Sequence, residues 1–154
     1  MFPARGGVAS RRVEESSSAV DADAVEIRVD ASPTEAELSD LCEAVGWNRF
    51  GVDYAALQGY ALTTSGWTKE GRLIAWTSIV SDNVRHAFLL DVMVHPAFQK
   101  RGIGRAVVLR AIEEMRQRGV TAFHVDCTPE NAPFYEKCGF KMGAGGWLDL
   151  AVKA

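Results

Sequence analysis

Residues 91–105 read DVMVHPAFQKRGIGR, a stretch that predicts a strand, a turn and the start of a helix. The run before His95 is typical of a buried strand, and Pro96 predicts the turn. Gly102 and Gly104 let the backbone approach a bulky ligand and adopt unusual φ angles. Free N–H groups and the positive end of the helix dipole meet there, beside three basic side chains. The stretch therefore predicts an anion site, for which a pyrophosphate is the natural guest.

Two common phosphate-binding motifs are absent from this stretch. The Gly-Lys-Ser/Thr ending of a P-loop is missing, and no third glycine completes a dinucleotide fingerprint. On the glycines alone, Gly102 and Gly104 also suit a helix that needs them only for a tight turn.

The helix that follows is amphipathic. Ile103, Val107, Ala111 and Met115 recur at a spacing of four, and Gly119 is expected to end the helix. The opposite face is predicted to be solvated and consists of Arg110, Glu113, Glu114, Gln117 and Arg118.

A second amphipathic helix is predicted nearer the N-terminus. Residues 24–29 alternate as a strand does. Ser32 is then expected as the N-cap, with Pro33 in the first helical position and Glu35 completing a capping box. Gly46 is expected to end this helix. Its apolar face is formed by Leu38, Leu41, Cys42 and Val45, and a further short helix is expected through Tyr54, Leu57 and Tyr60.

The other segments are rich in β-forming residues. The expected elements are a strand and turn at 67–72, a hairpin of 73–80 and 87–94 around Ser81–Asn83, a strand at 121–127, a short helix at 133–137, and a final hairpin from Phe140 that includes 147–152. This order predicts a mixed α/β fold with one central sheet.

Composition excludes several classes of protein. The chain has 154 residues and a net charge of −3, so we expect one domain at 21–154 and no nucleic-acid partner. No apolar run is long enough for a membrane span. Three cysteines favour a reducing, cytoplasmic location over a disulfide framework. Residues 1–20 are expected to be a disordered tail, and Glu14 and Glu15 count against a transit peptide.

Two motifs together resemble one family. Gln99-x-x-Gly102-x-Gly104 after a Val-Met-Val strand resembles motif A of the GNAT superfamily of acyl-CoA-dependent N-acyltransferases, and residues 131–140, NAPFYEKCGF, resemble its motif B. The resemblance covers residues 87–142 and is greatest to arylalkylamine N-acetyltransferase-like members. It implies a GNAT-like mixed, mostly antiparallel sheet with splayed strands and helices on both faces.

The resemblance also implies acetyl-CoA as co-substrate, with no metal. The backbone of the 92–94 strand would pair with the pantetheine arm, the loop N–H groups would hold the pyrophosphate, Asn131 would contact the pantetheine arm, and Tyr135 would lie near the thioester sulfur as general acid. The cofactor-binding residues implied are Val92, Met93, Val94, Gln99, Lys100, Arg101, Gly102, Ile103, Gly104, Arg105, Asn131 and Tyr135.

The function implied is transfer of an acetyl group from acetyl-CoA to a primary amine, by direct attack in a ternary complex. The acceptor is a small amine or a protein amine, and a homodimer is left open. One alternative is a catalytically weak acyl-CoA-binding sensor or interaction module of the same fold. Another is an unrelated phosphate-binding α/β domain.

The general base is less clearly indicated. Arylalkylamine N-acetyltransferases place histidines on the strand before motif A, where this chain has Phe88 and Leu90. Asp126, at a strand end, and Asp91 are the candidates, and either is also explained as a hydrogen-bonded strand-end carboxylate.

Other chemistry-bearing residues receive simpler explanations. We expect His95 to serve the turn, His124 to be a core histidine and Cys127 to be a small buried hydrophobe. The aromatic residues expected to pack in the core, or else to line an acceptor pocket, are Trp47, Phe50, Tyr54 and Tyr60.

Overall fold

The computed structural model describes residues 25–47 and 59–146. In chain order its elements are β1 (Glu26–Val29), α1 (Glu35–Ala44), β2 (Leu62–Trp67), β3 (Leu73–Ser81), β4 (His86–Val94), the 3-10 turn η2 (Pro96–Phe98), α3 (Ile103–Gln117), β5 (Ala122–Val125), the 3-10 turn η3 (Pro129–Asn131) and α4 (Ala132–Lys137). The expected tail, the helix expected through Tyr54 and Leu57, and residues 147–152 lie outside the described residues.

The described strands form one sheet in the order β1-β2-β3-β4-β5. The first four strands are antiparallel neighbours, whereas β4 and β5 are parallel. The chain reaches β5 through α3, since a parallel pair needs a long crossover connection. The predicted mixed, mostly antiparallel sheet is confirmed, although β2 begins at Leu62, before the expected Trp67.

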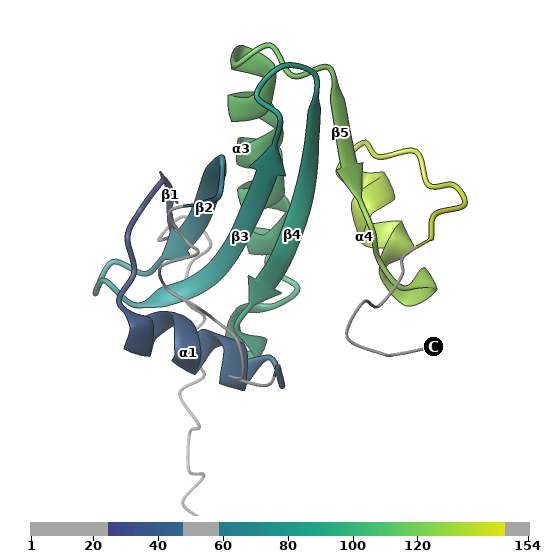
Figure 1. Ribbon diagram of the computed structural model, residues 1–154. Coiled ribbons are helices and arrows are strands. Elements are labelled where there is room, and N and C mark those ends of the chain that lie inside the picture. The colour runs from purple at the N-terminus through teal and green to yellow at the C-terminus, as the bar shows by residue number, and fades with distance from the viewer. Residues whose placement is uncertain (1–24, 48–58, 147–154) are drawn as a thin grey trace, which may run out of the picture.

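Helices pack on both faces of the sheet (Figure 1). On one face α3 packs against β2, β3 and β4, and the core there includes Leu62, Ile74, Ile79, Leu89, Val107, Val108, Ala111 and Met115. On the other face α1 packs against β3 and β4, and that core includes Leu38, Leu41, Cys42, Trp67, Trp76 and Met93. Full burial of a large apolar side chain contributes about 1.5–3 kcal/mol, so these two layers hold both helices on the sheet.

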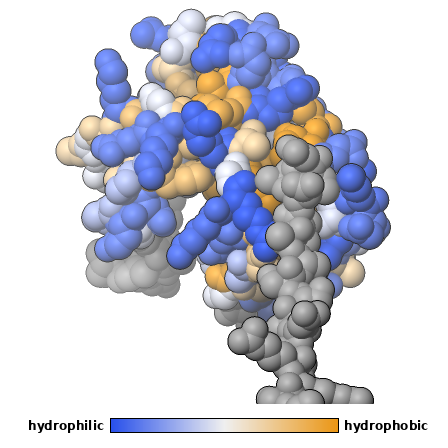
Figure 2. Space-filling model, turned by 180° about the vertical axis from the view of Figure 1, so that it is seen from behind, coloured by the Kyte–Doolittle hydropathy of each residue, from blue (hydrophilic) through white to orange (hydrophobic). Residues whose placement is uncertain are grey.

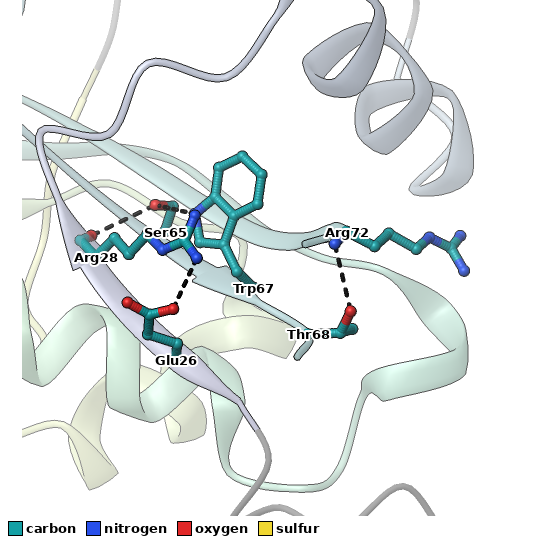
Figure 3. Close-up of polar contacts among 6 residues, drawn as sticks. All are labelled: Glu26, Arg28, Ser65, Trp67, Thr68 and Arg72. Carbon is teal, nitrogen blue, oxygen red and sulfur yellow. Dashed lines mark hydrogen bonds and ion pairs between the residues drawn. The ribbon is translucent and has the colours of Figure 1, made fainter. Parts of the chain in front are cut away.

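Trp67 anchors the layer under α1 (Figure 3). Its Nε1 donates a hydrogen bond of 2.8 Å to the Ser65 hydroxyl, so the buried indole keeps a partner for its only donor. The guanidinium of Arg28 lies over the ring, 4.8 Å from its centroid, and also pairs with Glu26 at 2.7 Å. Arg72 points away from the indole in this view. The ring is therefore fixed from the β1 side.

Helix α1 begins two residues later than predicted. Thr34 is the N-cap: its hydroxyl accepts from the Glu37 N–H at 3.3 Å, and the Glu37 carboxylate accepts from the Thr34 N–H at 2.7 Å. The cap predicted at Ser32 is wrong because Pro33 is buried outside the helix, so the equally spaced Thr34-x-x-Glu37 closes the box instead. Gly46, with φ +78°, follows the helix end as expected.

The turn between β3 and β4 confirms the predicted hairpin. The Asp82 carboxylate accepts hydrogen bonds from the N–H groups of Val84, Arg85 and His86 at 2.8–2.9 Å. These three donors stabilise the ionised carboxylate and lower the pKa of Asp82 to about 2.

A β-bulge interrupts β4 at Asp91. Trp76 pairs with Met93 and Ser78 with Leu90, so two residues of β4, Asp91 and its successor, face one residue of β3. Asp91 has φ +51°, a left-handed conformation uncommon outside glycine. The bulge shifts the alternation of β4, and strand residues on its two sides therefore reach different faces.

The C-terminal part of the fold departs from expectation. The strand predicted at 121–127 is shorter, because its pairing with β4 ends at Val125. Residues 140–146 contain no strand, although a hairpin was expected from Phe140; three of these seven residues are glycines, which have no side chain to pack on a sheet. Of the helices in the described ranges, none combines the length and apolar character needed to cross a bilayer.

Candidate functional site

The site begins where β4 and β5 part. Their parallel ladder ends at the pair Leu89–Val125, and β4 continues without β5 to Val94. Strand β5 leads instead into η3 and α4, which lie away from the end of β4 (Figure 1). The last five residues of β4 therefore lack a strand partner on this side within the described chain, and an extended ligand can pair there.

The loop from β4 to α3 has the geometry of an anion site. Lys100 and Gly102 have φ angles of +61° and +80°, and such left-handed residues turn neighbouring N–H groups toward one side. No side chain caps the N-terminus of α3, which begins at Ile103. Its first N–H groups and the helix dipole are thus available to a negative charge.

Gly104 lies where the first turn of α3 passes closest to its neighbours. A Cβ at this position would lie 3.1 Å from Cγ2 of Val94 and 3.5 Å from the ring of Phe134. Glycine is thus required by space here rather than by backbone conformation, because Gly104 is inside the helix.

The loop, the end of β4 and helix α4 enclose a cleft of about 680 Å³. Its lining consists of Val92, Val94, Gln99, Lys100, Gly102, Gly104, Arg105, Asn131, Phe134, Tyr135 and Lys137. Seen from the α3 side, the molecule is hollowed at its lower edge and hydrophilic residues border the hollow (Figure 2). Three of the lining residues are basic, which suits a polyanionic ligand.

Most of the predicted binding residues meet in this cleft. Nine of the twelve line it; the exceptions are Met93, Arg101 and Ile103. The side chains of Met93 and Ile103 are buried in the two cores, and Arg101 lies over the Phe98 ring at 5.5 Å. Phe134 and Lys137 were not predicted, although their place in motif B was a usable signal.

Two polar contacts shape the cleft. The Gln99 amide Nε2 donates to the Val94 carbonyl at 2.9 Å, which ties the loop to the end of β4. The Nε of Arg105 donates to the Lys137 carbonyl at 3.1 Å, which joins α3 to α4. The basic walls of the cleft are therefore held at fixed positions.

Tyr135 lies on the α4 wall of the cleft. Its side chain is 9% exposed and makes edge contacts with the rings of Phe134 and Phe140, at 5.0 and 5.9 Å between centroids. Burial raises the pKa of Tyr135 to about 12, and the neighbouring Cys127 and Cys138 thiols act in the same direction. The phenol is therefore a protonated donor throughout the neutral range.

Asp126 lies outside this cleft. It is exposed and lines a second hollow of about 790 Å³ beside β5 and residues 140–146. Cys127 is next to it and half-buried, so the expectation of a small buried hydrophobe holds only in part; burial, and then the charge of Asp126, raise the pKa of the Cys127 thiol. This thiol is less reactive than an ordinary one.

Asp91 lies at the bulge and is held by two hydroxyls. Its Oδ2 accepts from the Ser78 hydroxyl at 2.7 Å and from the Tyr60 hydroxyl at 3.3 Å. Burial and the Asp91 charge raise the pKa of Tyr60, so this phenol remains a donor. Tyr60 therefore makes a polar contact that a simple core aromatic lacks. Of the other aromatic residues expected in the core or in an acceptor pocket, Trp47 is 45% exposed, and Phe50 and Tyr54 lie outside the described residues.

The two other candidate histidines differ. His95 serves the turn as expected: its Nδ1 accepts from the Ala97 N–H at 3.2 Å, while burial and the Arg72 guanidinium lower its pKa. His124 is half-buried on the sheet surface, so the core assignment is wrong. It lies on the edge strand β5, and its Nε2 is 3.0 Å from Nδ1 of His86.

A comparison with known protein families identifies the class of this protein, and that class agrees with the cleft just described. Residues 30–140 match the acetyltransferase (GNAT) family, which is well over half of the chain. The chain therefore belongs to the GNAT acetyltransferase family.

Individual relatives agree with this assignment. The chain is 31% identical over 109 residues to an uncharacterised N-acetyltransferase, ycf52, of Pyropia yezoensis, covering 68% of this chain and 63% of the relative. It is 31% identical over 113 residues to GCN5-related N-acetyltransferase 1, chloroplastic, of Arabidopsis thaliana, covering 71% of this chain and 57% of the relative. It is 35% identical over 81 residues to serotonin N-acetyltransferase 2, chloroplastic, of Oryza sativa subsp. japonica, covering 53% of this chain and 40% of the relative. The chain thus spans less than two thirds of the length of these relatives.

Solved structures show the same fold. An acetyltransferase of Trypanosoma brucei matches with a TM-score of 0.67 at 23% identity, covering 82% of this chain and 99% of that one. Glucosamine-6-phosphate N-acetyltransferase of Arabidopsis thaliana matches with a TM-score of 0.65 at 17% identity, covering 80% and 97%.

Proposed function

We propose that this chain transfers an acetyl group from acetyl-CoA to a primary amine. The observation that carries the proposal is the cleft at the parting of β4 and β5, where an anion-binding loop and Tyr135 line one cavity. Membership of the GNAT family supports acetyl-CoA as the co-substrate.

The lining of the cleft fits acetyl-CoA. The loop around Lys100 and Gly102 offers N–H groups and positive charge to a pyrophosphate. The end of β4 from Val92 to Val94, which has no strand partner on the β5 side within the described residues, offers peptide groups to the pantetheine arm, and Asn131 also lines the cleft. Gly104 keeps the space beside Val94 open.

The reaction requires orientation and two proton movements. Acetyl-CoA, when bound, supplies an activated acetyl thioester. Direct attack by the amine needs no covalent enzyme intermediate, so proximity within a ternary complex supplies much of the acceleration. Tyr135 holds a proton for the departing thiolate sulfur, because its raised pKa keeps the phenol protonated until the sulfur becomes basic.

The proton lost by the amine goes to a carboxylate, either Asp126 or Asp91. Asp126 is exposed beside Cys127, whereas Asp91 is half-buried at the bulge. The variants Asp126→Asn and Asp91→Asn separate them: loss of the base lowers kcat and removes the acidic limb of its pH profile.

A finer likeness to arylalkylamine N-acetyltransferase-like members is part of this proposal. The motifs at 92–105 and 132–140 support it, as does the rice relative named for serotonin. Phe88 and Leu90 stand where those enzymes carry histidines, so we propose the same reaction with a different base.

The experiment is a steady-state assay of CoA release with acetyl-CoA and a panel of primary amines. We expect turnover, and a fall in kcat of about a hundredfold or more for Tyr135→Phe with little change in acetyl-CoA affinity. Binding of acetyl-CoA without turnover of any amine would instead support the catalytically weak sensor. Equal kcat for Tyr135→Phe would remove Tyr135 from the mechanism.

A further inference from the structure

We infer that Phe98 is a positioning residue for the proposed acetyl-CoA site: its buried ring anchors the Arg101 side chain outside the cleft and so fixes the loop from Lys100 to Gly102 in its anion-binding conformation. Phe98 is not among the residues that line the cleft. This inference rests on the proposed function and deepens it, because it names a residue that acts on co-substrate binding without touching the co-substrate.

The backbone of this loop is strained. Lys100 has φ +61°, in the left-handed region that residues with a side chain rarely adopt. Such a conformation persists only where the surrounding structure determines it. Crowding does not determine it at Gly102, since a Cβ built there would meet nothing within 4 Å. Side-chain contacts on either side of Lys100 are left to hold the loop in this shape.

Two anchored side chains flank the strained residue. On one side, the Gln99 amide Nε2 donates to the Val94 carbonyl at 2.9 Å. On the other side, the Arg101 guanidinium lies over the Phe98 ring, 5.5 Å from its centroid, where the negative face of the ring attracts a cation. Arg101 consequently lies outside the cleft, although the residues before and after it line the cleft.

The Phe98 ring is a rigid anchor. It is 8% exposed and belongs to the core under α3. The N–H of Phe98 donates to the His95 carbonyl at 2.8 Å, and the N–H of His95 donates to the Ile74 carbonyl of β3, also at 2.8 Å. The short turn that carries the ring is therefore tied to the central sheet.

A second guanidinium fixes the orientation of the same ring. Arg72, between β2 and β3, lies over the ring at 5.9 Å, and its Nη2 is 2.9 Å from Nε2 of His95. The His95 imidazole in turn meets the Phe98 ring edge-on, with 5.7 Å between centroids. Figure 3 shows the Arg72 side chain extending away from the Trp67 indole. The ring therefore offers Arg101 a preorganised surface.

Loss of this ring face should weaken acetyl-CoA binding more than it slows the reaction. A leucine at position 98 keeps apolar bulk in the core but has no ring face for Arg101. The freed loop would then have to be ordered when the pyrophosphate binds, which lowers affinity. The thioester lies at the other end of the pantetheine arm from the pyrophosphate, so turnover at saturating acetyl-CoA should be preserved.

The test is titration calorimetry with acetyl-CoA, together with kcat at saturating acetyl-CoA. Phe98→Leu and Arg101→Leu should each raise Kd about fivefold or more, and kcat should change less than about twofold. Phe98→Tyr keeps the ring and should bind within about twofold of wild type. Arg110→Leu is the matched control for charge, since Arg110 pairs with Glu114 on the exposed side of α3; its Kd should change less than about twofold.

Two further measurements separate loop positioning from a general loss of structure. The double variant Phe98→Leu/Arg101→Leu should bind no more weakly than the weaker single variant, because both changes remove one contact. Acetyl-pantetheine carries the thioester without the pyrophosphate, so Phe98→Leu should leave kcat/KM for this donor within about twofold of wild type. Additive losses in the double variant, or an equal loss with acetyl-pantetheine, would overturn the inference.

Failure of the inference differs from failure of the proposed function. If Phe98→Leu does not fold, as its Tm would show, Arg101→Leu alone decides, because the Arg101 side chain is only partly buried. Wild-type affinity in Arg101→Leu would overturn the inference and leave acetyl-CoA binding intact. An absence of acetyl-CoA binding in wild type would overturn the proposed function itself.

Discussion

Arg105, in the first turn of α3, donates a hydrogen bond of 3.1 Å from its Nε to the carbonyl of Lys137, the last residue of α4. Both residues line the cleft, so this contact joins two of its walls. It also leaves the two terminal nitrogens of the guanidinium beside the anion-binding loop, because Nε alone is used.

Arg105→Gln is therefore expected to weaken acetyl-CoA binding by at least about tenfold, since it removes a charged donor and loosens α4. Titration calorimetry measures the effect. Arg110→Gln, on the exposed side of the same helix and ion-paired with Glu114, is the control and should bind as wild type does. Equal losses in both variants would mean that only the net charge of α3 matters.

Gly104→Val should also reduce acetyl-CoA affinity, because its Cβ would lie 3.1 Å from Val94 and its methyl groups would project into the cleft. Gly143→Val is the matched control, as a Cβ there meets nothing within 4 Å. The same calorimetric titration applies, with Tm of each free variant as a check on folding. Undiminished affinity in Gly104→Val would show that the ligand does not approach this helix turn.

The high pKa of Tyr135 predicts a loss of stability in alkali. Its pKa is about 12 in the folded chain against 10.0 ordinarily, so the stabilisation is complete below pH 10 and is lost as pH rises to 12. Relative to Tyr135→Phe, wild type should lose about 2 kcal/mol of unfolding free energy between pH 9 and pH 12, where the folded phenol is half ionised. Urea unfolding of both proteins at pH 9 and pH 12 measures this loss. If the unfolding free energies of wild type and Tyr135→Phe change equally between the two pH values, the phenol is solvated in the folded chain.

The N-cap of α1 has two candidates in the sequence, Thr34 and Ser32, and their variants should differ in stability. Thr34→Ala should lower the free energy of unfolding by about 1 kcal/mol, because the reciprocal box with Glu37 is lost. Ser32→Ala should change it by less than about 0.5 kcal/mol. Chemical denaturation of both variants tests this prediction. A larger loss of stability for Ser32→Ala would show that Ser32 is the N-cap, as the sequence pattern predicts.

Asp82 predicts acid sensitivity of the β3–β4 turn. Its lowered pKa means that its stabilisation is present above pH 3.8 and is lost as pH falls through about 2. Asp82→Ala should therefore have a Tm several degrees below wild type at pH 7, with the difference shrinking toward pH 2. A difference in Tm that is the same at both pH values would show that the charge plays no part.

The sequence predicts those parts of the fold that have strong local signals. The apolar spacing from Ile103 to Met115 and the glycines around α3 locate that helix and its loop, since both depend on nearby residues. The cap of α1 was misplaced because Ser32 and Thr34 satisfy the same spacing rule, and the buried Pro33 decides between them.

The features that were not predicted depend on residues distant in sequence. The bulge at Asp91 arises from pairing with β3, and it decides that Val92 faces the cleft while Met93 faces α1. The same parting of strands ends β5 at Val125, two residues before the predicted end. The contact of Tyr60 with Asp91 joins residues 31 positions apart, which no local pattern encodes.

The central claim is that the cleft binds acetyl-CoA, and thermal unfolding of the full chain tests it most directly, with ADP as the control. At about 100 times its dissociation constant a ligand adds roughly 2.7 kcal/mol, which for this size raises Tm by about 5–11 °C. We predict that shift with acetyl-CoA and a much smaller one with ADP. No shift with acetyl-CoA over a wide concentration range, or an equal shift with ADP, would contradict the claim.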